Sequence, residues 1–422
     1  MATDVAIKLA TPLLQMATEY PTEYWNDSCN AAELAYAIDN GAVGATSNPT
    51  IVGTVMQQEY DTWAPRVRAI VAEHPDWTDQ EVTWQVIEEM AIRGWKMLEP
   101  IYHEHHGQKG RLSIQINPTF DRSVEKMLEQ ARHFDTLAPN VQIKFPATAA
   151  GVEAIEQATY EGMVINATVS FTVPQALAVG AAVERALARR EAEGKDTSWM
   201  APTCTIMIGR TDDWVKKSCQ RDGITIDPAA ADWAGIAVFK RAAAIFEERG
   251  YRSRLLAAAY RHHLHWSELI GGDISMTIPA SWQRLFNSSA VEVRDRWHDP
   301  VPAAHVEELL ARVRAHLRRR GTEAGGDRIL RFADLQLDPD TREVNRGERT
   351  ISLTAREFDL LHLFLQNPNR VLSKDSILDR TWGYAFDDNL VEVYVGYLRR
   401  KLGPPSLIQT LRGAGYALRD GS

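Results

Sequence analysis

The sequence predicts an α/β fold, a (β/α)8 TIM barrel, followed by a small α+β winged helix-turn-helix domain. Between about residues 20 and 290, short apolar runs alternate with helix-length amphipathic segments, which is typical of parallel strands joined by crossover helices. Beyond a Gly-rich stretch at 321–326, the pattern changes to short strands, three helices and a terminal hairpin. A chain of 422 residues is also too long for one ordinary core.

Eight candidate strands lie in the first part of the chain, and this number suits a closed barrel. Helix-length segments such as 79–106 and 174–193 separate them. A doubly wound open sheet is the structural alternative, but no Gly-x-Gly-x-x-Gly motif follows an early strand. The strands are expected at 24–27, 42–48, 111–117, 141–146, 164–171, 199–209, 255–260 and 274–279.

The C-terminal part has the turn and capping signals of a winged helix. Thr354 and Glu357 form a capping box that begins a helix. The Gly-rich residues at 412–415 are typical of a β-hairpin turn. Short strands separated by turns are expected within 328–345 and 349–353, a pair of strands at 407–411 and 416–418, and helices at 354–367, 374–382 and 389–402. We therefore assign residues 1–305 to the barrel, 306–326 to a basic helix and Gly-rich linker, and 327–422 to the winged-helix domain.

Composition limits the functional classes. The net charge of −9 argues against bulk nucleic-acid affinity, although basic residues cluster at 312–320 and 399–401. No apolar run approaches the roughly 20 residues that span a bilayer, and the N-terminus lacks a basic stretch followed by an apolar core. We expect a cytoplasmic protein with no membrane partner. Three cysteines without CxxC spacing predict neither a disulfide framework nor a metal site.

Lys144 interrupts the apolar strand expected at 141–146. Burial disfavours the charged form of a lysine, so such a residue is costly unless it is used or paired. A lowered pKa frees the amine to attack a carbonyl and form an imine. A structural ion pair is the alternative interpretation of the same residue.

Six blocks of sequence at the ends of the expected strands resemble the motifs of a known family. They are Asp27-Ser-Cys-Asn30, Ala45-Thr-Ser-Asn48-Pro-Thr50, Ile143-Lys144-Phe-Pro146, Asn166-Ala-Thr168-Val-Ser-Phe171, Ile208-Gly-Arg210 with Asp213-Trp214, and Ala259-Tyr-Arg261 with Thr277-Ile-Pro279. In this order they resemble the transaldolase family of class I aldolase-type barrels. Active sites of such barrels lie at the C-terminal ends of the strands, where these blocks stand.

The resemblance implies a Schiff-base transferase or aldolase of the pentose phosphate pathway type, acting on phosphorylated sugars without a cofactor or metal. Lys144 would form the imine, Asp27 would act as general acid/base, and Arg210 would bind the phosphate. The implied catalytic residues are Lys144, Asp27, Thr168 and Gln115, and the implied substrate-binding residues are Asn48, Asn166, Thr205 and Arg210. The alternatives are that Asp27 and Asn48 cap helices and that Arg210 makes a surface ion pair.

Three positions depart from the family pattern. Gln115 stands where transaldolases usually have glutamate, whereas the fructose-6-phosphate aldolase relatives have glutamine there. The amide of glutamine cannot carry a proton in an acid/base relay. Thr205 replaces a common serine, and Met207 replaces an aromatic residue. These differences leave the sugar specificity and the catalytic efficiency open. The sequence also does not decide between transfer of a carbon fragment and aldol cleavage.

The last 95 or so residues carry a second resemblance. Motifs at 353–361, 371–374, 391–402 and 410–416 resemble the effector domain of OmpR/PhoB-class response regulators. Val391, Val395, Leu398 and Leu402 have helical spacing and predict one buried face. The opposite face could enter the major groove of double-stranded DNA. The candidate DNA-binding residues are Asn389, Val393, Tyr397, Arg399, Arg400, Lys401, Thr410 and Arg412.

The join between the two patterns is informative. Residues 307–320 resemble the last helix of a receiver domain, yet no earlier segment resembles the rest of one. We therefore expect a fusion in which phosphorylation in cis does not control DNA binding. DNA affinity should be modest, salt-sensitive and strengthened by homodimer formation. The alternatives are a regulator whose barrel only senses sugar phosphates and an enzyme with a vestigial DNA-binding tail.

Overall fold

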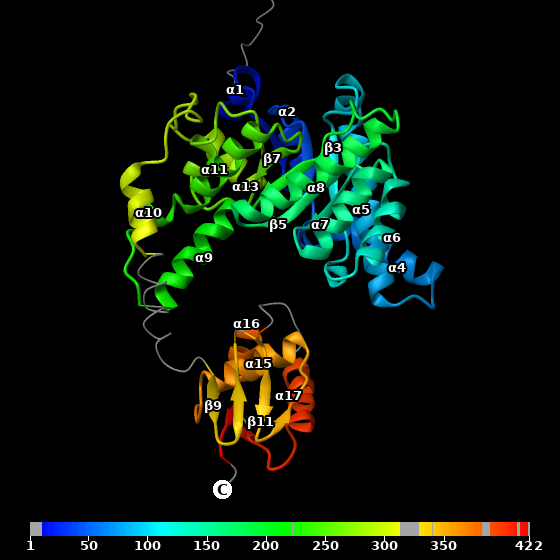
Figure 1. Ribbon diagram of the computed structural model, residues 1–422. Coiled ribbons are helices and arrows are strands. Elements are labelled where there is room, and N and C mark those ends of the chain that lie inside the picture. The colour runs from blue at the N-terminus through cyan, green and yellow to red at the C-terminus, as the bar shows by residue number, and fades with distance from the viewer. Residues whose placement is uncertain are drawn as a thin grey trace, which may run out of the picture. The chain divides into compact units, whose positions relative to one another are not determined.

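The computed structural model describes residues 11–221, 223–312, 329–339, 341–381, 389–411 and 414–420. The chain divides into two compact units, Met1–Val313 and Arg314–Ser422 (Figure 1). The predicted Gly-rich linker at 321–326 lies outside the described residues.

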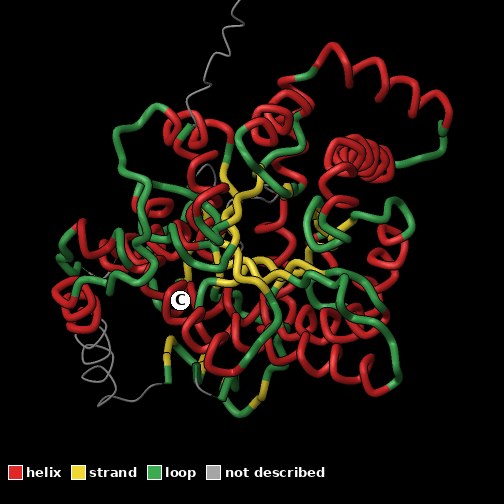
Figure 2. Tube along the Cα trace, turned by 90° about the horizontal axis from the view of Figure 1, so that it is seen from above, coloured by secondary structure: helices red, strands yellow, loops and turns green. Residues whose placement is uncertain are grey.

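The first unit contains a closed barrel of eight parallel strands in the order β1 to β8. Pairing of Glu23 on β1 with Ser275 on β8 closes the barrel. Figure 2 shows these strands in the middle of a surrounding set of helices, and the predicted (β/α)8 class is confirmed. The strands are β1 Glu23–Asn26, β2 Gly44–Thr46, β3 Arg111–Gln115, β4 Val141–Pro146, β5 Ile165–Ser170, β6 Thr203–Ile206, β7 Arg254–Ala257 and β8 Ser275–Ile278.

Local signals in the sequence set where the helices begin. Thr78 and Glu81 form a reciprocal capping box at the start of α5, and the Asn48 side chain caps α3 ahead of Pro49. None of the helices within the described residues is long and apolar enough to cross a bilayer. The barrel helices are α1 Pro12–Glu19, α2 Ala31–Asp39, α3 Pro49–Gln58, α4 Tyr60–Glu73, α5 Asp79–Glu104, α6 Val124–Asp135, α7 Ala149–Glu161, α8 Val173–Ala192, α9 Ile208–Arg221, α10 Pro228–Ala231, α11 Ala234–Arg249, α12 Leu264–Ser267 and α13 Ala280–Asn287.

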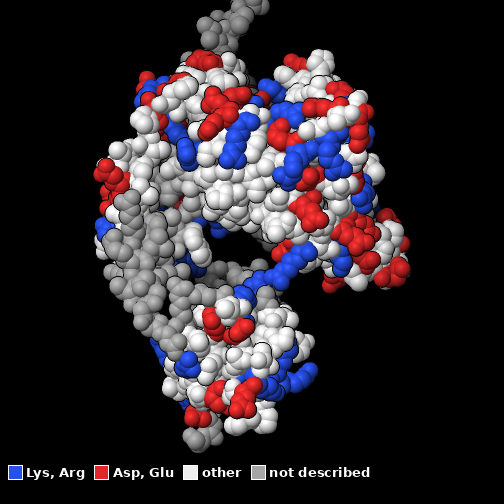
Figure 3. All heavy atoms as spheres, viewed as in Figure 1, with Lys and Arg blue, Asp and Glu red and all other residues white. Residues whose placement is uncertain are grey.

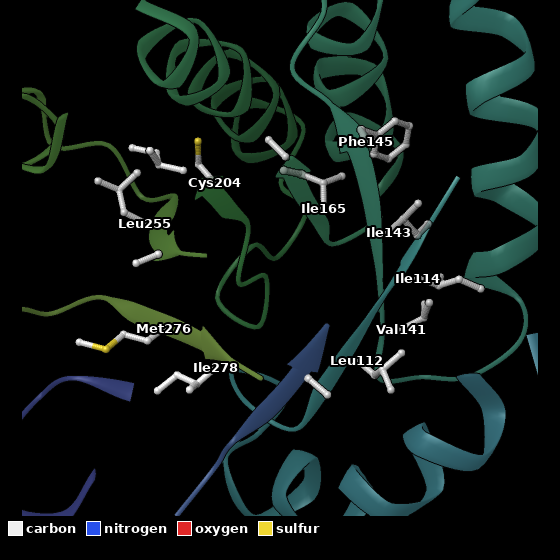
Figure 4. Close-up of a cluster of buried hydrophobic side chains, with 14 of the residues drawn as sticks. Leu112, Ile114, Val141, Ile143, Phe145, Ile165, Cys204, Leu255, Met276 and Ile278 are labelled. Atoms are coloured by element: carbon white, nitrogen blue, oxygen red, sulfur yellow. The ribbon is translucent and has the colours of Figure 1, made fainter. Parts of the chain in front are cut away.

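The alternation of side chains along β4 places Lys144 inside the barrel. Val141, Ile143 and Phe145 belong to the apolar cluster between strands and helices (Figure 4). Gln142 has the opposite orientation and accepts a hydrogen bond from Ser113 on β3 at 2.6 Å. Because side chains of a strand alternate between its two faces, Lys144 shares the interior face with Gln142. Lys144 stands nearer the C-terminal end of the barrel.

The strand predicted at 199–209 is shorter in the structure. β6 ends at Ile206, and α9 begins at Ile208, so Arg210 lies in a helical turn. The start of α9 passes very close to the loop that follows β7, because a Cβ atom at Gly209 would lie 1.7 Å from the carbonyl oxygen of Ala259. Only glycine permits this approach, and sequence periodicity does not reveal it.

The second unit is a winged helix. A four-stranded antiparallel sheet of order β12-β11-β10-β9 precedes three helices, and the antiparallel hairpin β13–β14 follows them. Val391, Val395, Leu398 and Leu402 are all buried, which confirms the predicted inner face of α17. The elements are β9 Leu330–Phe332, β10 Leu335–Leu337, β11 Val344–Arg346, β12 Arg349–Thr350, α15 Ala355–Leu365, α16 Lys374–Thr381, α17 Asn389–Leu402, β13 Ile408–Leu411 and β14 Gly415–Leu418.

Leu398→Ala should destabilise the second unit by about 2–5 kcal/mol, because it leaves a cavity in the core beneath α17. Hydrogen exchange of the 389–411 backbone in the full chain measures this loss. Val393→Ala on the exposed face of the same helix is the matched control and should change stability by about 0.5 kcal/mol or less. Equal protection in the two variants would contradict the assigned core.

Candidate active site and candidate DNA-binding surface

A cavity of about 540 Å³ opens at the C-terminal ends of the barrel strands. The structure brings seven of the eight predicted active-site residues to its wall, while Asn166 lies elsewhere. Those that line the cavity are Asp27, Asn48, Gln115, Lys144, Thr168, Thr205 and Arg210.

The Lys144 side chain extends from β4 into this cavity and is only 7% exposed. Its Nζ donates a long hydrogen bond of 3.4 Å to the carbonyl oxygen of Ser47. Burial lowers the pKa of the Lys144 amine, and the Asp27 carboxylate opposes this shift. A larger fraction of the amine is therefore neutral, and able to attack a carbonyl, than in a solvent-exposed lysine.

Asp27 follows β1 and faces the same cavity. Its Oδ1 accepts a hydrogen bond of 2.7 Å from Thr46 Oγ1. Thr46 Oγ1 also lies 2.5 Å from Thr277 Oγ1, and since Thr46 has one hydroxyl hydrogen, Thr277 must be the donor of that second bond. Burial raises the pKa of the Asp27 carboxyl, whereas Lys144 and the Thr46 hydrogen bond oppose this shift. A carboxyl with a raised pKa is suited to exchange a proton near neutral pH.

Two of the predicted substrate-binding residues, Asn166 and Asn48, have structural roles in the barrel. Asn166 is fully buried; its amide donates to Ser113 Oγ at 3.0 Å, and its oxygen accepts from Thr205 Oγ1 at 2.7 Å. Asn166 therefore supports Thr205 from the polar layer below the cavity and does not line the cavity. Asn48 caps α3 through its oxygen, so the alternative of a capping role is realised, although the residue also lines the cavity.

Sequence reasoning assigned no role to two further residues of the cavity wall, Arg261 and Tyr260. The Arg261 guanidinium pairs with Asp213, with a shortest distance of 2.7 Å. The Tyr260 hydroxyl is buried and makes no hydrogen bond to a described residue. Both follow the seventh strand directly, so their positions at a strand's C-terminal end were the available signal.

Among the described residues, one group of side chains has the composition of a metal site. The ligand atoms of Asp212, His262 and His265 lie within 4.8 Å of one another. However, His265 Nδ1 accepts a hydrogen bond from the Arg261 backbone N–H, so the ring proton must be on Nε2, which faces Asp212. A metal ion at Nε2 would displace that proton. The neutral ring would then carry its proton on Nδ1, which faces the Arg261 N–H donor. The group is better described as a hydrogen-bond network.

The visible face of the barrel unit carries no large field of one sign. Lys and Arg side chains are interspersed there with Asp and Glu (Figure 3). The basic side chains in the described cavity wall are Lys144, Arg210 and Arg261, and the two arginines are the groups suited to attract an anionic ligand there.

The exposed face of α17 presents Val393 and Tyr397, which are 44% and 43% exposed. The guanidinium of Arg400 lies over the Tyr397 ring at 5.9 Å. Asn389 begins the helix, but its side chain and the whole of Arg412 lie outside the described residues. An aromatic and a basic group on one exposed helix face suit contacts with bases and phosphates.

The other predicted DNA-binding residues have partners within the domain. Arg399 donates to the carbonyl oxygen of Ile408 at 2.9 Å and to Thr410 Oγ1 at 2.7 Å. Lys401 pairs with Glu357 at 2.7 Å. These contacts hold α17 to the hairpin and to α15, so Arg399 and Lys401 would have to share their charge between protein and phosphate.

Comparison with known proteins agrees with this architecture. The family model described as Transaldolase/Fructose-6-phosphate aldolase matches residues 24–329. The model described as Transcriptional regulatory protein, C terminal, matches residues 347–418.

Similar curated proteins are response regulators. The response regulator MprA of Mycobacterium tuberculosis is 55% identical over 127 residues, which is 29% of this chain and 55% of that protein. The protein of the same name from Mycolicibacterium vanbaalenii is 54% identical over 128 residues, with the same coverage. The chain thus spans about half the length of the curated relatives it matches.

A solved structure, the Klebsiella pneumoniae RstA DNA-binding domain in complex with RstA box, is 28% identical. The match covers 22% of this chain and 98% of that chain, with a TM-score of 0.21. Since one family model covers most of the sequence and the second covers the winged helix, the chain belongs to the transaldolase/fructose-6-phosphate aldolase family and carries a C-terminal DNA-binding domain of the OmpR/PhoB class.

Proposed function

We propose that the barrel is a class I transaldolase or aldolase that acts on phosphorylated ketoses through a Schiff base at Lys144. In the same cytoplasmic chain, the winged helix would bind double-stranded DNA in a sequence-specific manner. The observation that carries the catalytic proposal is the buried Lys144 amine, which shares its cavity with Asp27 and with two arginines.

The chemistry follows from these groups. The neutral Lys144 amine adds to the ketose carbonyl, and loss of water with uptake of one proton from solvent gives the protonated imine. Asp27 then accepts the proton of the hydroxyl on the carbon that becomes the aldehyde. As the adjacent C–C bond breaks, its electron pair moves toward the imine nitrogen, which leaves an enamine on Lys144 and a free aldehyde. The enamine adds to a second aldehyde in transfer, or is protonated and hydrolysed in cleavage.

Two neighbouring residues would assist without carrying the proton. Gln115 pairs with Lys144 in the β3–β4 register, and its amide is suited to hold a water molecule beside the imine. Thr168 lies on the same wall of the cavity and offers a hydroxyl. Since Gln115 cannot ionise, Asp27 is the group to which proton transfer is assigned.

The phosphate of the substrate would bind at the arginines. Arg210 is exposed at the start of α9, and Arg261 follows β7. A guanidinium presents parallel N–H donors that match phosphate oxygens. Because Asp213 already pairs with Arg261, Arg210 would supply the larger share of the uncompensated charge.

Borohydride reduction in the presence of fructose 6-phosphate should trap a covalent adduct at Lys144, and Lys144→Ala should abolish it. Mass spectrometry of the digested protein locates the adduct. Lys109→Ala removes a partly exposed lysine of the same unit, paired with Glu23, and should leave trapping unchanged. A wild-type protein without an adduct would favour the alternative that the barrel only senses sugar phosphates.

Asp27→Asn should move the acidic limb of the pH profile for imine formation to lower pH. The Asp27 charge raises the pKa of Lys144 against the effect of burial, so its removal lowers the pKa further and the neutral amine persists in more acidic solution. The rate of adduct formation measured from acidic to alkaline pH tests this shift. A limb that stays in place or moves to higher pH would contradict the coupling of the two groups.

For the DNA-binding unit, we propose that α17 enters the major groove with Val393 and Tyr397 toward the bases. Arg400 would contact a phosphate. Thr410 lies on the hairpin and is held by Arg399, so the hairpin and the helix would meet DNA as one surface.

Arg400→Ala should weaken binding to duplexes selected from a random pool. It should also reduce the slope of the logarithm of affinity against the logarithm of salt concentration by about one, since one phosphate contact is lost. Gel shifts at several salt concentrations measure both effects. Arg331→Ala, on β9 of the four-stranded sheet, serves as the matched control and should leave the slope unchanged. An unchanged slope for Arg400→Ala would exclude this phosphate contact.

A further inference from the structure

A fully buried carboxylate lies directly behind the cavity arginines. Asp212 stands in the first turns of α9, two residues after Arg210, and is completely buried. Its Oδ1 accepts from the Gly235 backbone N–H at 2.7 Å, and its Oδ2 accepts from His265 Nε2 at 2.7 Å and from His262 Nε2 at 3.1 Å. Burial, the largest single effect, raises the pKa of Asp212, but the hydrogen bonds from His262, His265 and the Gly235 backbone, together with the charge interaction with His265, outweigh it and hold the pKa below its usual value.

The network continues to the second arginine. His265 is also fully buried, and its Nδ1 accepts the backbone N–H of Arg261 at 3.1 Å. Both ring nitrogens are therefore engaged, with Nε2 donating to Asp212 and Nδ1 accepting from Arg261. One hydrogen-bonded path thus joins the backbone of Arg261 to the helical turn that bears Arg210.

The packing around both arginines leaves little freedom for their backbone to shift. The close approach of Gly209 to the Ala259 carbonyl packs the start of α9 against the loop after β7. Ala259 itself has a positive φ of 69°, a conformation that a non-glycine residue adopts only when its surroundings impose it. Asp213 holds the Arg261 guanidinium from the adjacent position on α9.

We propose that Asp212 and His265 are positioning residues that fix the spacing of Arg210 and Arg261 for the phosphate of the substrate. This inference rests on the proposed function, since it concerns recognition of a phosphorylated ketose at the same cavity. Donors held at a fixed spacing lose less conformational freedom when they bind an anion. Among the residues that the structure describes, no hydrogen bond joins Asp212, His262 or His265 to Lys144 or Asp27, so the effect of the network falls on substrate affinity and not on the chemical step.

His262 provides an internal contrast. It donates to the same Asp212 oxygen, but it is partly exposed, and its Nδ1 has no hydrogen-bond partner among the described residues. It therefore steadies Asp212 without extending the path to Arg261. Removal of His262 should have a smaller effect than removal of His265.

Asp212→Asn tests the proposal. The amide would place a donor against either Gly235 N–H or a histidine N–H and so break the path. Borohydride trapping at Lys144 is measured over a range of fructose 6-phosphate and of fructose, which differ only in the phosphate. We expect the half-saturating concentration of fructose 6-phosphate to rise about tenfold, with the maximal rate and the half-saturation by fructose unchanged. Asp273→Asn, an exposed carboxylate paired with Arg254, should change neither.

His265→Gln is the second variant, because glutamine keeps a donor near Asp212 but carries its acceptor oxygen on the same carbon as that donor, and not at the position of Nδ1 that faces Arg261. It should also weaken binding of fructose 6-phosphate but not of fructose. It replaces Asp212→Asn as the test if circular dichroism shows that Asp212→Asn does not fold. An equal loss of affinity for both sugars, or no loss of affinity for either, overturns the proposal. Calorimetric titration with inorganic phosphate gives a readout independent of catalysis: weaker binding in the variants supports positioning even if no adduct forms, whereas unchanged binding overturns it.

Discussion

The burial of one lysine beside one carboxylate is the constraint on which the rest of the barrel depends. Each charge alone is unfavourable away from water, and each reduces that cost for the other. The arrangement requires the register of β4, because a slip of one residue would turn Lys144 toward the helices and bring an apolar side chain into the cavity. The ladders to β3 and β5 that hold this register are therefore part of the site.

Beneath the lysine, a polar layer closes the barrel. Ser113, Gln142 and Thr203 are joined by hydrogen bonds across the interior, and Asn166 links Ser113 to Thr205. A layer in which buried polar groups bond one another is rigid, because each side chain has few alternative partners. The reactive groups thus stand on a fixed base, which is what a geometry-dependent reaction requires.

Periodicity and local capping signals allowed the strands, the long helices and the inner face of α17 to be predicted from the sequence. The features that were not predicted depend on contacts between distant segments. The end of β6 is set by the approach of Gly209 to Ala259, and Asn166 proved to lie below the cavity. Asp212 and His265 are separated by 53 positions, so neither motif spacing nor composition could pair them.

Among the described residues, the two units have separate hydrophobic cores, and no buried residue belongs to both. Each core encloses its own apolar side chains, so neither unit relies on the other to keep water out. A break in the polypeptide between residues 313 and 329 would consequently yield two self-supporting pieces: a barrel of the transaldolase/fructose-6-phosphate aldolase family and a separate, small DNA-binding domain.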